Sequence, residues 1–206
     1  MNKYKTDQEN FWAESFGDDY IERNQGSQLL ASNLNFFNKA LQYCKNLNSA
    51  IEFGANIGMN LKAIQLLLPQ IELKGVEINQ KAVTELAAVI GQHNAIHSSI
   101  FDFNDQNLVD LTLIKGVLIH INPDMLPVVY EKLYKHSKQY ILIAEYYNPS
   151  PVNINYRGHE DRLFKRDFAG EMLEKYPDLE LVDYGFSYRK DPVYPQDDIT
   201  WFLLKK

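Results

Sequence analysis

Residues 51–58 and 75–79 combine glycines and carboxylates at a spacing suited to ligand binding. Gly54 and Gly58 lie four residues apart, and Glu52 precedes the first glycine by two positions. Glycines in a strand-to-helix turn let the main chain approach a ligand closely. Glu77 follows Gly54 by 23 residues, near the interval of about 20 residues at which carboxylates accept hydrogen bonds from ribose hydroxyls. These residues predict a site for a nucleoside-bearing cofactor.

The glycine spacing also indicates which cofactor binds. Dinucleotide sites usually carry Gly-x-Gly-x-x-Gly, which admits a pyrophosphate, whereas this chain has Gly-x-x-x-Gly with Asn56 between. Asparagine tolerates unusual backbone angles, so we expect the turn to form. The pattern Glu-x-Gly-x-x-x-Gly resembles the first motif of class I S-adenosylmethionine-dependent methyltransferases. The alternative is a tight strand-helix connection without a ligand.

Length and composition indicate one ordinary globular domain. The chain has 206 residues and a mass of 23.9 kDa, with 45% hydrophobic and 23% charged residues, within the range of a single hydrophobic core. Its net charge is −6 and its pI is near 5.4. An acidic chain has no general attraction to phosphate backbones, so we do not expect a nucleic-acid partner.

The cysteine content and the N-terminal residues favour a cytoplasmic protein. Cys44 is the only cysteine, so an internal disulfide is excluded. Residues 1–10 are polar and lack the apolar segment of a secretion signal. The sequence contains no run of roughly 18 apolar residues, so we expect no membrane span.

Apolar periodicity predicts alternating helices and strands. We expect helices over residues 27–44, 59–68, 80–90, 122–135 and 165–176, and strands over residues 50–53, 71–78, 96–101, 111–114 and 140–145. Strands that alternate with helices favour parallel pairing. Residues 179–188 and 199–205 predict an antiparallel hairpin at one sheet edge, and residues 148–156 and 191–198 read as loops.

The prediction is therefore a single-domain, Rossmann-like α/β fold. Its sheet is mostly parallel and seven-stranded, with an antiparallel C-terminal hairpin and helices on both faces. We expect residues 1–45 to form an N-terminal helical cap, residues 46–147 the cofactor-binding core, and residues 148–206 the substrate loop and the hairpin.

Ligands of such sheets bind beyond the carboxyl ends of the strands, and further polar candidates fall there. Glu77 would meet the ribose, Phe101 would pack on the adenine, and Asp102 would accept from its amino group, while Ile78 is assigned to the same cofactor. Lys115 ends the fourth strand and is assigned to the same cofactor. For Asp102, helix capping or plain solvation is the alternative.

Histidines and a carboxylate near the same edge are candidates for catalysis. His120 is a candidate because an unperturbed imidazole titrates in the range of a general base, although a histidine packed at the helix entrance is the alternative reading. Glu145 ends the fifth strand, and His159 lies in a polar segment rich in tyrosine and arginine. We assign substrate binding to Tyr146, Tyr156, Arg157 and Arg162, which suit an anionic, polyhydroxylated ligand, and we assign no metal ion.

Several segments together resemble one named group, the pseudaminic acid biosynthesis-associated methylase family. They are Phe11-Trp12, residues 20–24, 52–58 and 75–79, residues 116–123 (Gly-Val-Leu-Ile-His-Ile-Asn-Pro), residues 157–164 (Arg-Gly-His-Glu-Asp-Arg-Leu-Phe) and residues 197–204. The resemblance implies a methyltransferase of pathways that build nonulosonic, sialic-like sugars of bacterial surface glycans. It also implies that Tyr20 and Arg23 close over the cofactor.

The resulting prediction is an enzyme that binds S-adenosyl-L-methionine and methylates an oxygen or nitrogen of a small polar metabolite, releasing S-adenosyl-L-homocysteine. The metabolite is a nonulosonic acid or a nucleotide-sugar intermediate if the family resemblance holds. Two alternatives stay open: a cofactor-binding protein of a glycan pathway without catalysis, and a nicotinamide-dependent oxidoreductase. No oligomeric state follows from the sequence.

Overall fold

Helices and strands alternate along the chain, as the apolar periodicity predicts. The computed structural model describes residues 4–14, 16–18, 21, 25–156 and 159–206, with the backbone alone for Tyr156 and residues 159–162. In chain order the elements are α1 (Asp7–Ala13), α3 (Ser27–Ala40), β1 (Ser49–Phe53), α4 (Met59–Leu67), β2 (Glu72–Glu77), α5 (Gln80–Ile90), β3 (Ala95–His97), β4 (Val109–Lys115), the 3₁₀ helices η1 (Leu118–His120) and η2 (Pro123–Met125), α6 (Leu126–His136), β5 (Ser137–Glu145), β6 (Val152–Tyr156), β7 (His159–Lys165), α7 (Phe168–Lys175), β8 (Glu180–Ser187) and β9 (Ile199–Lys205).

Seven of the described strands form one sheet in the order β3-β2-β1-β4-β5-β9-β8. Strands β1 to β5 pair in parallel, and β9 pairs antiparallel with both β5 and β8. The predicted fold class is therefore confirmed, including the C-terminal hairpin. Because β2 and β4 lie on opposite sides of β1, the connections diverge there, and a crevice opens beyond the carboxyl ends of β1 and β4.

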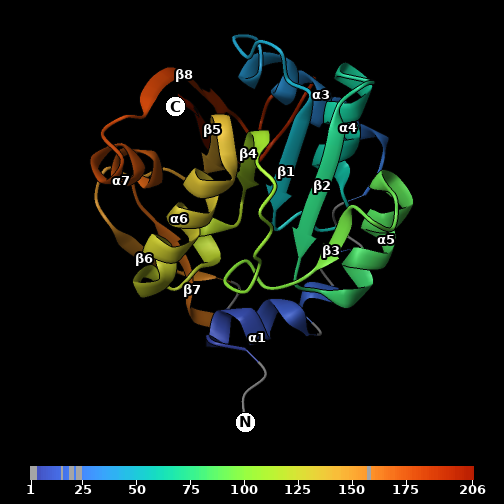
Figure 1. Ribbon diagram of the computed structural model, residues 1–206. Coiled ribbons are helices and arrows are strands. Elements are labelled where there is room, and N and C mark those ends of the chain that lie inside the picture. Colours follow the sequence, from blue (N-terminus) through green and yellow to red (C-terminus); the bar gives the residue numbers. More distant parts are fainter. Residues whose placement is uncertain (1–3, 15, 19–20, 22–24, 157–158) are drawn as a thin grey trace.

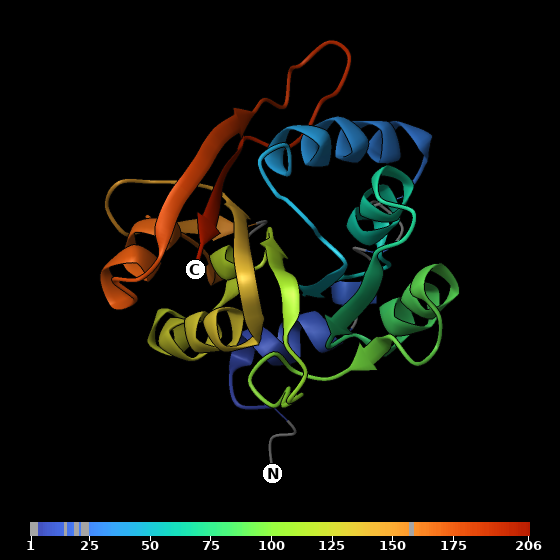
Figure 2. The ribbon, with the colours of Figure 1, turned by 45° about the horizontal axis from the view of Figure 1, so that its top comes forward.

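Helices cover both faces of the sheet (Figures 1 and 2). Helices α3, α4 and α5 pack on one face, around the fully buried Phe37, Leu61 and Leu113. Helices α6 and α7 pack on the other, around Phe53 and Met172. Burial on both faces explains why the central strands are continuous apolar runs rather than alternating ones.

Helix α1 lies across the carboxyl ends of the parallel strands, below β1 and β2 in Figure 1. A capping box begins this helix: the Thr6 side chain accepts from the Glu9 amide, and the Glu9 carboxylate accepts from the Thr6 amide. Such a reciprocal pair satisfies two amides that a helix leaves unbonded at its start. Within the described part of the chain, every helix lacks the length or the apolar character that a membrane span demands.

Several predicted boundaries were too generous. Strand β3 ends at His97 rather than at residue 101, because Ser99 turns the chain by accepting at its carbonyl from the amides of Asp102 and Phe103. Helix α3 ends at Ala40, and helix α7 begins only at Phe168, where Asp167 caps it. A 3₁₀ turn over Pro123–Met125 precedes α6.

The expectation of a loop over residues 148–156 was wrong in its second half. Val152–Tyr156 forms β6, which pairs antiparallel with β7 (His159–Lys165) as a separate two-stranded sheet. Val152 and Ile154 alternate with asparagines, which is the period of a strand. The prolines and tyrosines around this short alternation favoured a loop in the sequence.

Candidate functional site

A cavity of about 630 Å³ opens at the carboxyl ends of the parallel strands, at the predicted crevice. Eight of the predicted site residues line it: Gly54, Asn56, Glu77, Ile78, Phe101, Lys115, His120 and Tyr146. Four others, Glu52, Gly58, Asp102 and Glu145, lie outside its lining. The strand ends chosen from the sequence therefore meet at one cavity, and the structure separates the residues that face this cavity from those behind its lining.

The turn after β1 depends on left-handed backbone conformations. Gly54 and Gly58 have φ of 75° and 82°, and Asn56 has φ of 46°, which confirms that asparagine at this position accommodates the turn. A Cβ on Gly54 would meet Val117 Cγ2 at 2.5 Å. Gly54 is thus required by the packing of this turn against the segment after β4 as well as by its own backbone angle.

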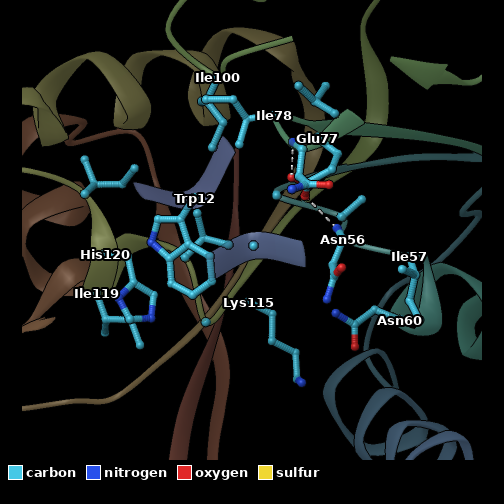
Figure 3. Close-up of a pocket in the computed structure, with 18 of the residues that line it drawn as sticks. Trp12, Asn56, Ile57, Asn60, Glu77, Ile78, Ile100, Lys115, Ile119 and His120 are labelled. Carbon is cyan, nitrogen blue, oxygen red and sulfur yellow. Dashed lines mark hydrogen bonds between the residues drawn. The ribbon is translucent and has the colours of Figure 1, made fainter. Parts of the chain in front are cut away.

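Glu77 fixes this turn from the neighbouring strand. Its carboxylate accepts from the Asn56 amide at 2.8 Å and from the Asn79 amide at 2.8 Å (Figure 3). Burial is the main influence on its pKa and raises it, while the amide hydrogen bonds act in the opposite direction. A carboxylate has about four acceptor sites, so Glu77, which lines the cavity, retains capacity for ligand hydroxyls.

Glu52 lies beneath the cavity rather than in its wall. Its side chain is fully buried, and one oxygen accepts from Asn60 Nδ2 at 2.6 Å. The other oxygen has no hydrogen-bond partner among the described residues. Burial raises the pKa of Glu52 to about 8, so the carboxyl is mostly protonated at neutral pH and holds Asn60, which does line the cavity.

Glu145 occupies a supporting position too, in contrast to the catalytic role expected for it. It is buried at the end of β5 and accepts from the amides of Val117 and Leu118, both at 2.9 Å. Burial raises the pKa of Glu145 to about 7. The carboxylate therefore ties β5 to the turn after β4, and it has no surface in the cavity.

The side chains of Phe101 and Asp102 point in different directions at the turn that follows β3. Phe101 is buried and lines the cavity with Ile100 and Ile78, which together form an apolar surface suited to an aromatic ring. Asp102 points to the protein surface, where its side chain is 61% exposed and pairs with Lys5 Nζ at 2.5 Å. This placement favours an ion pair over the adenine contact predicted for Asp102.

His120 lies in η1 and is buried under Trp12 of α1, with 4.7 Å between their ring centroids. Figure 3 shows the two rings side by side at the cavity wall. A second contact holds α1 in place, since Ser99 Oγ donates to the Glu9 carboxylate. Glu9 and Trp12 were missed as site residues, although the capping box Thr6-x-x-Glu9 is a sequence signal for a helix here.

The far end of the cavity is bounded by Lys115, Tyr146 and the segment before β9. That segment folds over α3, where Gln196 Nε2 donates to Asn33 Oδ1 at 2.8 Å. Asp197 lines the same end. No local pattern announces this contact, because its two partners are 163 residues apart in the chain.

The remaining predicted residues are less completely described. Tyr20, Arg23 and Arg157 lie outside the described residues. Tyr156, His159 and Arg162 belong to the hairpin of β6 and β7, of which β7 packs against η1. Their roles in catalysis and in substrate binding stay predictions.

Comparison with known proteins shows the fold. No family model matches the chain, and no curated protein matches it. Three similar solved structures are a didemethyltoxoflavin N1-methyltransferase from Burkholderia thailandensis (TM-score 0.69, 12% identity, 100% of this chain and 93% of that chain), the magnesium protoporphyrin IX methyltransferase from Synechocystis PCC 6803 (0.66, 12%, 100% and 100%), and the mitomycin 7-O-methyltransferase (0.68, 14%, 98% and 61%). The chain thus spans only 61% of the length of the last enzyme. It has the fold of class I S-adenosylmethionine-dependent methyltransferases.

The Gly54 contact predicts a large loss of stability in Gly54→Ala. We expect the free energy of unfolding to fall by about 1–2 kcal/mol for the left-handed backbone and by about 1–3 kcal/mol more for the clash with Val117. Gly116→Ala is the matched control, since Gly116 also has positive φ but open space at its Cβ position. Urea unfolding measures both, and equal losses in the two variants would show that the contact is unimportant.

Burial of Glu52 predicts a pH-dependent stability. Between its ordinary pKa of 4.5 and about 8, the folded chain keeps a proton that the unfolded chain loses, so the free energy of unfolding falls as pH rises through this window. Glu52→Gln removes that loss, by up to about 1.4 kcal/mol per pH unit. In urea unfolding between pH 5 and 9, the free energy of unfolding of Glu52→Gln should rise relative to that of the wild type as pH increases. The control Glu72→Gln, at an exposed position, should have the same pH dependence as the wild type.

Proposed function

We propose that the protein is an S-adenosylmethionine-dependent methyltransferase that acts on an oxygen or nitrogen of a small polar metabolite. The observation that carries this proposal is one cavity that joins the glycine turn after β1, the Glu77 carboxylate and the apolar surface at Phe101. These three features lie side by side at the point where the sheet connections diverge, which is where such folds hold nucleoside ligands.

The residues fit the cofactor in a definite order. The apolar surface of Ile78, Ile100 and Phe101 would take the adenine ring, and Glu77 would accept from the ribose hydroxyls. The turn at Gly54 and the Asn60 side chain would meet the methionine part. Gly116 lies on the cavity wall, and no atom of the protein lies within 4 Å of the position that its Cβ would occupy. The main chain at Gly116 therefore leaves open space for the cofactor, which supports this fit.

The cofactor supplies a methyl group that is already activated, so the chain mainly orients the acceptor and excludes water. Helix α1 serves the second task, since its residues Trp12 and Glu9 line the cavity and Trp12 lies at the cavity wall (Figure 3). The predicted N-terminal cap over the site belongs to the same proposal. A cytoplasmic location, expected from the cysteine content, belongs to the same proposal.

Small-molecule acceptors are supported by several structural neighbours. Two of them are named as a mitomycin 7-O-methyltransferase and a didemethyltoxoflavin N1-methyltransferase. The finer proposal, a nonulosonic acid or nucleotide-sugar acceptor, rests on the sequence resemblance to the pseudaminic acid-associated methylases.

A cofactor-binding protein without catalysis is the second candidate. The observation that favours it is the position of Glu145, which bonds main-chain amides outside the cavity. The cavity therefore contains one predicted catalytic residue fewer. Incubation with S-adenosylmethionine and a small-molecule extract of the host separates the two functions. Formation of S-adenosylhomocysteine above the rate of a protein-free control supports the enzyme.

Calorimetric titration tests the cofactor assignment. We expect S-adenosylmethionine and S-adenosylhomocysteine to bind and NADH to fail. Glu77→Gln should weaken both adenosyl ligands by about tenfold or more, because a ribose hydroxyl loses a charged acceptor. Asp102→Asn is the matched control and should bind as the wild type does, since Asp102 lies outside the cavity. Binding of NADH alone would overturn the proposal.

A further inference from the structure

Lys115 differs from the other cations that lie near carboxylates in this protein. It ends the central strand β4 and extends into the cavity toward the end where Asn60 lies (Figure 3). Its ammonium group lies 5.5 Å from the centroid of the Phe36 ring. Within the described part of the chain this ammonium forms no hydrogen bond and no ion pair, whereas Lys74 and Lys81 pair with Asp105 and Asp18.

The order of the strands across the sheet puts Lys115 next to the glycine turn of the proposed cofactor site. The adenine surface lies at the ends of β2 and β3, the ribose acceptor Glu77 at the end of β2, and the glycine turn after β1. Strand β4 is the next strand in that order. A cofactor that ran from the adenine surface through Glu77 would therefore have its sulfur toward β4, with the acceptor beyond it near Tyr146, the residue that follows β5.

We infer that Lys115 takes the proton from the acceptor group while that group is methylated, an inference that rests on the proposed function. A lone pair of the acceptor oxygen or nitrogen forms the bond to the methyl carbon. The bond from carbon to sulfur breaks with its electrons on sulfur, which leaves S-adenosylhomocysteine. The acceptor proton passes to the neutral Nζ of Lys115, which becomes an ammonium group.

Burial makes it easier for Lys115 to lose its proton. Burial lowers its pKa, against the opposing effect of Glu52 on β1, Asp197 before β9 and Glu145 on β5. Glu52 and Glu145 themselves have raised pKa values, about 8 and about 7, so their negative charge is only partial at neutral pH. Lysines act as bases in environments of this kind, where the amine is desolvated and has no ion pair.

The rival role for Lys115 is to hold the carboxylate of the methionine part of the cofactor. Two ligands distinguish these roles, because S-adenosylmethionine and S-adenosylhomocysteine share that carboxylate and differ by one methyl group and one positive charge on sulfur. A lysine beside the sulfur discriminates between the two ligands. A lysine on the carboxylate affects both equally.

The test is calorimetric titration of both ligands into the wild type, Lys115→Met and Lys115→Arg from pH 6 to 9. We expect Lys115→Met to favour S-adenosylmethionine over S-adenosylhomocysteine by about tenfold relative to Lys115→Arg, because one like charge is removed. The wild type should shift from the Arg-like to the Met-like ratio as pH rises and Lys115 loses its proton. The pH dependence left in Lys115→Met belongs to the buried carboxyls Glu52, Glu77 and Glu145.

Equal weakening of both ligands in Lys115→Met would assign Lys115 to the carboxylate and overturn the inference, as would an unchanged ratio. Lys62→Met, on the exposed face of α4, is the control for a lost surface charge and should match the wild type. If neither ligand binds to a wild type that is folded by circular dichroism, the proposed function itself fails.

Transfer of a labelled methyl group to a host small-molecule extract then tests the proton step. Lys115→Arg keeps its proton at every working pH, so we expect transfer to fall by about 100-fold or more, although the variant still binds S-adenosylhomocysteine. Transfer by Lys115→Arg at the wild-type rate, or no transfer by the wild type, would overturn the inference.

Discussion

The close approach of Gly54 to Val117 is the contact on which the site depends. It seats the turn after β1 directly against the segment after β4, with no room for even one methyl group between them. Glu145 fixes that segment from β5 through two amide hydrogen bonds, and Glu77 fixes the turn from β2 through the Asn56 amide. The floor of the cavity is thus a main-chain surface held from both sides by buried carboxylates.

Those carboxylates make the electrostatics of the site unusual. Glu52, Glu77 and Glu145 are all buried, and burial raises the pKa of each. None of the ion pairs between described residues involves them, so desolvation is the main influence on their protonation, opposed by hydrogen bonds from backbone amides to Glu77 and Glu145 and from Asn60 to Glu52. A cavity of this kind suits a ligand that carries positive charge, since binding it relieves the cost of ionising these groups.

Two segments from opposite ends of the chain complete the cavity. Helix α1 covers it through Trp12 and Glu9, and the segment before β9 closes its far end through Gln196 and Asp197. The parallel strands alone would leave an open shelf at this edge. Enclosure limits the access of water, which supports transfer of a methyl group to a chosen acceptor.

The sequence by itself determined the seven-stranded sheet, the helices that flank it and the glycine turn, because apolar periodicity and the backbone freedom of glycine are local properties. It also placed Glu77 and Lys115 at strand ends, which is why both line the cavity. Only the tertiary structure decided that Asp102 turns outward to Lys5 and that Glu145 bonds main-chain amides. The same holds for Trp12 against His120 and for Gln196 against Asn33. The direction of a side chain at a strand end, and its partner across the fold, depend on contacts between residues far apart in the chain, which no local pattern encodes.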